Sequence, residues 1–474
     1  MSPPTFSLSG EFARSPLGHG ARTKRLIEIG MALERAPAAS FPAMFCDLAS
    51  TKRAYEFLGN PAVLPVNVLR GHVLNTLDRC ASRRRVLLVM DMTELDYTDH
   101  RATRGLGPIG DGNGRGVHVL TVLALDANTL EPLGVLHQEC WVRTAVQPGR
   151  RRSESTYARS LRERESQYWQ RAIRASRNAI GEAAPTTRFV VVADQGADIF
   201  DNFETCRACN FGFVIRMYQD RRLDVPDADS DSSVGVASHL MARLAQQPVV
   251  AHKEVNVRDT NNRAMRVARC EVRHTTVSIH APQTRRGHSS QKLTVVQLRE
   301  TQAPAGQKPV CWNLATDETI TNAVDALQQA TEYESRWTVE DFHMGLKTGC
   351  AIEQRQFKSR HAIENFLSMA SAQTWQMLWL RQQARAATPS TVATILSPGQ
   401  REALHVLCSH LPRDANAKES LVAIAKLGGY FGRKSDGPPG WRTIWKGFQY
   451  LMTYAEGFEA ARDHSEILLP PRLK

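Results

Sequence analysis

The apolar run VLLVM at residues 86–90 is followed at once by Asp91, and the run FVVVA at residues 189–193 is followed at once by Asp194. Such runs of Val and Leu are typical of strands that are buried on both faces of a sheet. We therefore expect both carboxylates to lie at the carboxyl ends of central strands, where ligands of α/β sheets gather. An aspartate after a strand often only caps the next turn, so this pattern does not establish a site by itself.

Further apolar runs in the same region extend the pattern into a larger sheet. The next two predicted strands are VHVLTVLAL at 117–125 and LGVLHQECWV at 133–142. The turn signal Asp126-Ala127-Asn128 between them predicts a hairpin. A helix is expected over about residues 153–180, before the strand that ends at Ala193. Strands, then a helix, then a strand buried on both faces describe a mixed α/β fold.

The chain of 474 residues exceeds the size of one hydrophobic core, so two or three domains are expected. After a polar, acidic stretch at 219–235, strand-like segments follow near 250–257, 265–280 and 292–300. Helical patterning runs from 322 to about 385 and, after a loop at Ala387 to Ser390, continues to the end. The expected organisation is a helical domain over 1–78, an α/β domain over 79–385 with a β-rich insertion at about 220–320, and a helical region over 386–474.

Positive charge dominates the composition and indicates a polyanionic partner. Lys and Arg number 60 against 48 Asp and Glu, which gives a formal net charge of +12. Such an excess favours nucleic acid, because binding releases the condensed counterions of the phosphates. Two basic clusters lie in the small N-terminal helical domain, and they are Arg22, Lys24 and Arg25, and Lys52 and Arg53 with Tyr55. Solvated helix faces carry similar charges, but two clusters in one small domain favour DNA contact.

Several other classes of protein and site are not supported. No apolar stretch approaches the roughly 18 residues of a membrane span, and the N-terminus lacks a secretory pattern, so a cytoplasmic, nucleoid-associated protein is expected. Disulfides are then not expected, and the close pair Cys206 and Cys209 has no second pair with which to bind zinc. The glycine-rich stretch at 105–116 lacks the Gly-Lys-Ser/Thr ending of a phosphate-binding loop and is predicted to be a mobile hairpin loop.

The segment ATEYESRWTVEDFHMGLKTG at residues 330–349 predicts a helix with a chemically distinctive face. At 100° per residue, four side chains fall within an arc of about 60°, and they are Tyr333, Arg336, Glu340 and Lys347. The apolar stripe lies on another side and consists of Val339, Phe342 and Leu346. An ordinary amphipathic helix with a solvated polar face would show the same periodicity. The polar face, however, combines a carboxylate that suits a metal with groups that suit a phosphate, which favours a site.

Three carboxylates would supply the chemistry of such a site. Asp91, Asp194 and Glu340 are the hard oxygen ligands that divalent cations prefer, and Mg²⁺ is the expected ion, with Mn²⁺ as a substitute. Two ions suit phosphodiester chemistry, because one activates a water or 3′-hydroxyl and the other stabilises the leaving oxygen. They also neutralise the charge that builds at phosphorus. We therefore expect these three residues to be both catalytic and metal-binding.

At these residues the chain resembles the cut-and-paste DDE transposases of the insertion-sequence-four family, and most closely the Tn-five group. The most specific element is Tyr333-x-x-Arg336-x-x-x-Glu340-x-x-x-x-x-x-Lys347, which matches the family's Tyr-Arg-Glu-Lys signature with every spacing intact. Supporting stretches are DMTELDY from Asp91, GVLHQECW at 134–141, DQGADIF from Asp194 and AKLGGYFGRKSDGPPGW at 425–441. The resemblance covers nearly the whole chain.

The resemblance implies both a fold and an activity. The fold is an RNase H-like catalytic core with a β insertion between Asp194 and Glu340, an interval of 146 residues (340 minus 194). The N-terminal helical domain would bind double-stranded DNA at the transposon ends, and the C-terminal helical region would dimerise. The homodimer would pair two inverted repeats, nick each end, release the element through hairpins and join it to target DNA.

The resemblance also implies DNA contacts for two further residues. Trp312 lies 21 residues (333 minus 312) before Tyr333, where the family has a tryptophan that stacks on a base flipped out of the transposon end. A Trp after an apolar strand is otherwise usually part of the core. Arg216 in FVIRMY matches an arginine that the family directs at DNA near the active site.

Two departures from the family pattern bear on function. Gln195 and Gly196 replace an Arg-Glu pair after the second aspartate, which puts any role of those charges in doubt, and His19 stands where the family often has Asp. Two rival functions are a catalytically silent DNA-binding regulator derived from a transposase and another RNase H-like nuclease, such as a structure-specific resolvase. The intact carboxylates argue against the first rival, and the Tyr-Arg-Glu-Lys face argues against the second.

Overall fold

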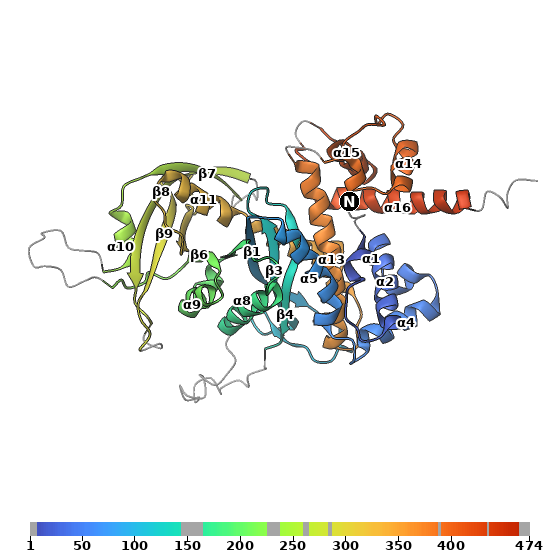
Figure 1. Ribbon diagram of the computed structural model, residues 1–474, viewed down its shortest axis with the longest axis horizontal. Helices are drawn as coiled ribbons and strands as arrows, with labels where there is room; N and C mark the ends of the chain where they lie inside the picture. The colour runs from blue at the N-terminus through green and yellow to red at the C-terminus, as the bar shows by residue number, and fades with distance from the viewer. Residues whose placement is uncertain are drawn as a thin grey trace, which may run out of the picture.

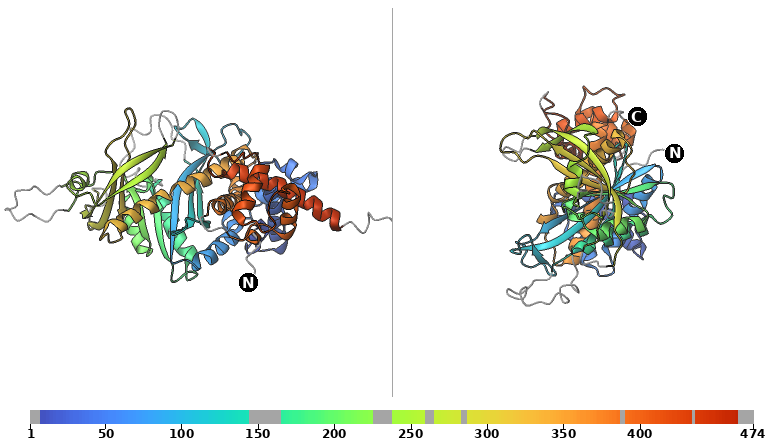
Figure 2. Two further views of the ribbon diagram at one scale, coloured as in Figure 1. Left: turned by 90° about the horizontal axis from the view of Figure 1, so that it is seen from above. Right: turned by 90° about the vertical axis from the view of Figure 1, so that its left-hand side faces the viewer.

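The computed structural model describes residues 7–143, 165–224, 238–258, 265–282, 287–386, 390–433 and 436–463. Its centre is a ten-stranded mixed sheet with helices packed around it (Figure 1). Strands from the middle of the sequence lie at one end of the molecule, and the N-terminal and C-terminal helices lie together at the other end (Figure 2). The first and the last helices of the described chain are therefore neighbours, and α16 (Trp441–Asp463) contacts α2 (Gly20–Arg35).

The strands follow the order β2-β3-β1-β5-β6-β10-β9-β8-β7, and β4 also pairs with β3. Their bounds are Arg85–Asp96 for β1, Gly107–Ile109 for β2, Gly114–Asp126 for β3, Pro132–Trp141 for β4, Arg188–Ala193 for β5, Gly212–Met217 for β6, Ala251–Arg258 for β7, Met265–Ile279 for β8, Gln291–Glu300 for β9 and Cys311–Thr316 for β10. The four strands predicted between residues 86 and 193 and the β3–β4 hairpin are confirmed. The glycine-rich stretch also forms a hairpin, through β2 and β3.

The central strand β1 differs from the prediction in one respect. It pairs in parallel with β5 only as far as Met90 opposite Ala193, but it pairs antiparallel with β3 as far as Asp96 opposite Gly116. Asp91 therefore lies within β1 and not at its end, and the prediction that it ends a strand is wrong. The reason is that β3 continues the ladder after β5 has stopped, and an apolar run marks only the doubly buried half of such a strand.

The expected β-rich insertion is present as an antiparallel extension of the same sheet. Strand β10 pairs with β6, and β9, β8 and β7 follow in turn. The short helix α10 (Leu240–Ala245) precedes these strands. Most of the polar, acidic stretch at 219–235 lies outside the described residues. The insertion thus continues the sheet instead of forming a separate β-domain.

The N-terminal helices are α1 (Leu8–Phe12), α2 (Gly20–Arg35), α3 (Phe41–Phe45), α4 (Leu48–Gly59) and α5 (Pro65–Ala81). The expected domain boundary at residue 78 falls in the last turn of α5. His19 caps α2, because its Nδ1 accepts a hydrogen bond from the backbone N–H of Ala21 at 3.1 Å. The imidazole thus satisfies one of the free amides of the helix start, as an aspartate would.

The remaining long helices are α8 (Ser166–Ile180), α9 (Phe200–Ala208), α11 (Ala323–Glu334), α12 (Trp337–Met344), α13 (Arg360–Arg385), α14 (Pro398–Leu407), α15 (Ala417–Leu427) and α16 (Trp441–Asp463). Of the helix expected at about 153–180, residues 153–164 lie outside the described residues. None of the helices in the described part of the chain has the length and apolar character that crossing a membrane requires.

Helix α13 packs against both the N-terminal and the C-terminal helices and against the sheet. It packs against α4, α5 and β4 on one side and against α15 and α16 on another (Figure 1). Its buried polar side chains anchor the surrounding elements. Asn365 donates to the carbonyl oxygens of Leu58 and Val63, at 2.9 and 3.0 Å, and Trp375 donates its indole N–H to the carbonyl of Pro132 at 2.7 Å. Each bond satisfies a buried polar group, as a tightly packed interface requires.

A buried ionic network joins α1, α5 and β4. His72 accepts the backbone N–H of Val135 through Nε2 at 2.9 Å, so its Nδ1 carries the proton that faces Glu11 Oε2 at 2.5 Å. Arg79 forms an ion pair with Glu11 at 2.9 Å and lies 4.1 Å from the ring centroid of Trp375. Burial raises the pKa of Glu11, but His72 and Arg79 more than offset this and lower it to about 2. Burial also lowers the pKa of His72.

We predict that Glu11→Gln lowers the free energy of unfolding by roughly 3 kcal/mol, because it leaves the buried side of Arg79 without its anion. The folded pKa of Glu11 lies below the ordinary value of 4.5, so the stabilisation is full above that pH and is lost as the pH falls towards 2. Urea unfolding between pH 7 and pH 3 measures this loss. Glu56→Gln, at an exposed ion pair, is the control. If the free energy of unfolding of Glu11→Gln falls with pH as much as that of wild type, the prediction is wrong.

Candidate active site

The pairing of β1 with β5 places Asp91 and Asp194 side by side. The last paired residues of the two parallel strands are Met90 and Ala193, so the two aspartates are the next residues on strands about 4.8 Å apart. Each carboxylate accepts a local backbone N–H at 2.8 Å: that of Met92 for Asp91 and that of Gly196 for Asp194. The position expected for Asp194, directly after its strand, is confirmed.

Negative charge is concentrated at Asp91. Its side chain is 17% exposed. Burial raises its pKa to about 6, and Asp194 and Glu340 add to this, while Arg336 and the N–H of Met92 oppose it. At neutral pH, which lies above this pKa, the carboxylate is charged, and its burial lowers the free energy of unfolding. A site with this property attracts cations.

The helix expected over residues 330–349 is not one uninterrupted helix. It consists of α11, which ends at Glu334, α12, and a π-helical turn over Gly345–Gly349. At the first junction the hydrogen bonds tighten to three-residue spacing, from Arg336 N–H to the carbonyl of Tyr333 and from Val339 N–H to that of Arg336. At the second, a side chain on Gly345 would lie 2.6 Å from Thr374 of α13. The close approach of Gly345 to Thr374 at the second junction is a tertiary contact that periodicity does not reveal.

Arg336 connects the helical segment to the strands. Its guanidinium lies 2.6 Å from Glu340 Oε1 and 3.5 Å from Asp91 Oδ2. Glu340 is 53% exposed, so its carboxylate is open to solvent beside the buried Asp91. Tyr333 lies beneath, 2% exposed, with its ring centroid 6.0 Å from the guanidinium carbon. Burial raises the pKa of Tyr333, while Arg336 and Arg216 lower it. The positive charges of both arginines therefore lie close enough to the Tyr333 hydroxyl to favour its ionised form.

Lys347 and Trp312, which were expected to contact DNA, form contacts within the protein. Lys347 forms an ion pair with Glu353 at 3.2 Å, next to the end of β1. Trp312 is 6% exposed, and its ring makes edge contacts with those of Tyr333 and Trp337, at centroid distances of 5.0 and 6.5 Å. Trp312 thus occupies a core position in this structure.

The departure at Gln195 and Gly196 has a local structural reason. These residues belong to the 3-10 turn η1 (Gln195–Ala197), in which the Asp194 carboxylate accepts the backbone N–H of Gly196. A side chain at Gly196 would lie 3.0 Å from Asp194 Oδ1 and 3.4 Å from the Trp169 ring. Glycine therefore leaves room for the carboxylate and the ring to approach the turn closely.

A buried row of polar side chains lies behind the site, and the sequence analysis missed it. Thr121 is the partner of Asp91 across the β1–β3 ladder, and it lies 3.3 Å from His343 Nε2 and 3.3 Å from Gln138 Nε2. Gln138 in turn accepts a hydrogen bond from Ser371 of α13 at 2.8 Å. Burial lowers the pKa of His343 to about 3. The neutral imidazole, one helical turn after Glu340, fixes α12 against β3.

Both ends of the chain match families of known proteins. Residues 8–63 match the family described as Transposase DNA-binding, and residues 373–468 match the family described as Transposase Tn5 dimerisation domain. The matches support a Tn5-like transposase. They also support binding to DNA and association with a second copy of the chain.

All five basic residues singled out in the N-terminal domain fall within the DNA-binding match. Lys24 and Arg53 are exposed. Arg22 donates to the carbonyl of Leu17 at 3.1 Å, and Arg25 forms a local ion pair with Glu28 at 2.6 Å. These weak surface interactions can be exchanged for phosphate contacts at little cost.

The three carboxylates singled out in the sequence fit hard divalent cations by their chemistry and their unbalanced charge. Asp91, Asp194 and Glu340 offer only oxygen ligands, as Mg²⁺ and Mn²⁺ prefer. Across the described residues, the three do not form a group whose ligand atoms all lie within 4.8 Å of one another. Arg336 lies between Asp91 and Glu340 and supplies positive charge there.

We predict that Asp91→Asn stabilises the metal-free protein at pH 8 by roughly 1 to 3 kcal/mol. The folded pKa of about 6 exceeds the ordinary value of 3.8, so the cost of the charge is present above pH 6 and disappears as the pH falls below 4. Urea unfolding in EDTA at pH 8 and pH 4 measures the difference. Asp99→Asn, at an exposed position, should have no such effect. If Asp91→Asn is less stable than wild type at pH 8, the charge of Asp91 does not destabilise the folded protein.

Proposed function

We propose that this protein is a cut-and-paste DNA transposase of the DDE type, whose catalytic residues Asp91, Asp194 and Glu340 bind two divalent metal ions. The observation that carries the proposal is the adjacency of Asp91 and Asp194 beside Glu340, with Arg336 contacting two of the three carboxylates. The transposase family matches at both ends of the chain support the same activity. The strands β4, β3, β1, β5 and β6 would form its RNase H-like core.

In this proposal the three carboxylates would hold Mg²⁺, or Mn²⁺ in its place, which would supply Lewis-acid chemistry for the attacking and leaving oxygens. The residues around them position the DNA. Arg336, already oriented between two carboxylates, would turn to a phosphate when cations replace its charge. Tyr333 and Arg216 lie behind it, so they would fix its orientation from below.

Two of the proposed DNA contacts require a rearrangement when DNA binds. Trp312 can stack on a flipped base only if its ring leaves the contacts with Tyr333 and Trp337. Lys347 must exchange Glu353 for a phosphate. Both residues are at or near the helical junctions, where the backbone hydrogen bonds depart from the regular α-helical pattern. The irregular helical segment is therefore the part that we expect to move.

We predict that the purified protein with Mg²⁺ or Mn²⁺ nicks DNA that carries the inverted repeats flanking its gene. Glu340→Gln should reduce the cleavage rate at least about 1,000-fold, because the metal site loses a charged ligand. Binding of the same DNA in a gel-shift assay should stay within about 2-fold of wild type. Glu402→Gln, at an exposed glutamate of α14, is the matched control.

Two outcomes would contradict this function. Binding without any metal-dependent cutting would indicate a catalytically silent regulator. Cutting of branched DNA without preference for the inverted repeats would indicate a structure-specific nuclease.

The C-terminal helix α16 offers a surface for the second copy. Tyr450, Tyr454 and Phe458 follow one another at four-residue spacing and are 55%, 41% and 38% exposed. Such spacing puts the three rings on one helix face, and exposed aromatic stripes of this kind favour protein contacts. The face lies within the residues that match the dimerisation domain. We propose that it forms the homodimer contact of the paired-end complex.

We predict that Tyr454→Glu combined with Phe458→Glu weakens assembly of the paired-end complex at least about 10-fold, because each charge would be buried in an apolar contact. Native gels with labelled DNA ends separate single-end from paired-end complexes. Single-end binding should remain at the wild-type level. Val406→Glu, at a 53% exposed residue of α14, is the control, and an equal effect of this variant would argue against a specific α16 contact.

A further inference from the structure

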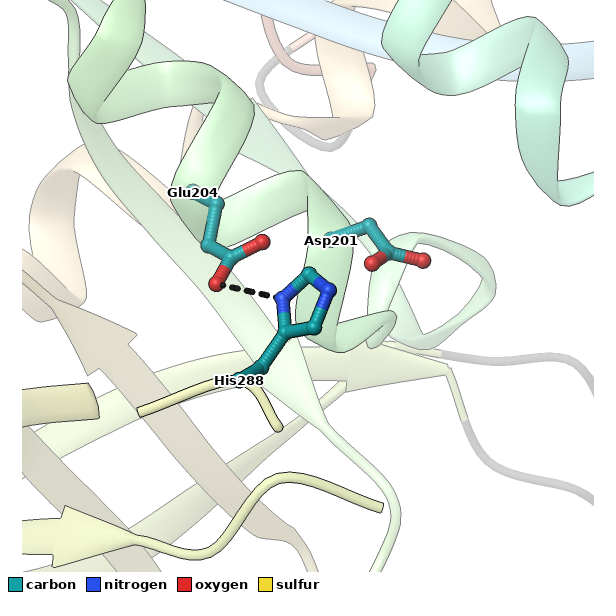
Figure 3. A group of neighbouring side chains, drawn as sticks. All are labelled: Asp201, Glu204 and His288. Atoms are coloured by element: carbon teal, nitrogen blue, oxygen red, sulfur yellow. Dashed lines mark hydrogen bonds and ion pairs between the residues drawn. The ribbon is translucent and has the colours of Figure 1, made fainter. Parts of the chain in front are cut away.

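A second group of potential metal ligands lies outside the proposed active site. Asp201 and Glu204 are three residues apart near the start of α9, so they lie on the same face of that helix. His288 comes from the connection between β8 and β9, in the insertion. Figure 3 shows the imidazole of His288 between the two carboxylates. The group therefore joins a helix of the core to the inserted strands.

The geometry of this group suits a metal ion. The ligand atoms of the three residues all lie within 4.8 Å of one another, and His288 Nδ1 is 3.2 Å from Glu204 Oε1. The side chains of His288 and Glu204 are 42% and 38% exposed, so an ion can enter from solvent and keep water ligands. One imidazole nitrogen with two carboxylate oxygens suits first-row transition metals such as Mn²⁺, Co²⁺ and Zn²⁺. Ca²⁺, which takes oxygen ligands, fits it less well.

The backbone that carries the three ligands is held in place without an ion. Gln291, at the start of β9, donates to the carbonyl of Phe200 at 3.1 Å and accepts from Arg207 at 2.8 Å. Arg207 also donates to the carbonyl of Lys292 at 2.6 Å. The ring of Phe200 makes an edge contact with His288 at a centroid distance of 6.4 Å. Because α9 and β9 are fixed to each other, little ordering of the backbone would oppose ion binding.

We propose that Asp201, Glu204 and His288 form a transition-metal site that links α9 to the β8–β9 connection. It is distinct from the proposed active site in ligand chemistry, because it contains an imidazole, and it shares no residue with Asp91, Asp194 or Glu340. Helix α9 begins six residues (200 minus 194) after Asp194. An ion bound here fixes the position of the insertion relative to the segment that carries the second catalytic aspartate.

The test is equilibrium dialysis of Zn²⁺ against the full-length protein with the double change Asp91→Asn and Asp194→Asn, which removes the two strand carboxylates of the proposed active site. Bound metal is then counted by elemental analysis. We expect His288→Ala in this background to lose one Zn²⁺ per chain, with at least about a 100-fold loss of affinity. His410→Ala, at an exposed histidine of the C-terminal region, should lose none.

A second measurement guards against misfolding of the variant. Zn²⁺ should raise the melting temperature of the background protein and of His410→Ala, but not that of His288→Ala or Glu204→Gln, since only a native site adds stability on binding. Equal Zn²⁺ content and equal melting shifts in all four proteins would overturn the proposal and leave Glu204 and His288 as a surface ion pair. Loss of DNA cleavage has no bearing on this outcome, so the two proposals can fail separately.

Discussion

The parallel pairing of β1 with β5 is the constraint on which the rest of the site depends. The pairing of these strands ends at Met90 and Ala193, and the next residue on each strand is an aspartate. The sheet therefore brings the two carboxylates together. Repulsion and burial then hold the pKa of Asp91 near 6. Backbone geometry thus brings two negative charges together, and the guanidinium of Arg336 lies beside one of them.

The third carboxylate is placed by a different kind of interaction. Glu340 lies on α12, which is short. The backbone hydrogen bonds span three residues just before this helix and five residues in the π-helical turn that follows it. Gly345 allows this segment to approach Thr374 of α13, and His343 bonds to Thr121, the neighbour of Asp91 on the next strand. The helix is therefore fixed from both the sheet and α13. Hydrogen-bonded packing at a distance from the three carboxylates thus determines where Glu340 lies relative to the aspartates.

Much of this arrangement was predictable from local pattern, and the rest depends on contacts between distant residues. The strands, the hairpin, the β-rich insertion and the position of Asp194 follow from runs of apolar residues and turn signals. Asp91 was placed at a strand end because periodicity does not show that β3 outlasts β5 as a partner of β1. The helical segment was expected to be continuous because periodicity shows neither the change of hydrogen-bond spacing after Tyr333 nor the contact of Gly345 with α13. The set of Asp201, Glu204 and His288 was missed because the histidine is 84 residues from Glu204 and is brought to it only by the fold.

The central position of α13 has a consequence for synthesis of the chain. Residues 360–385 leave the ribosome after the sheet and the N-terminal helices, yet α13 is buried against β4, α4 and α5, and it also packs against α15 and α16. Until then the apolar faces that receive it stay open to water, which favours aggregation of partly made chains. The packing of β4, α4 and α5 is therefore completed only when α13 and the helices that cover it, α15 and α16, are also present.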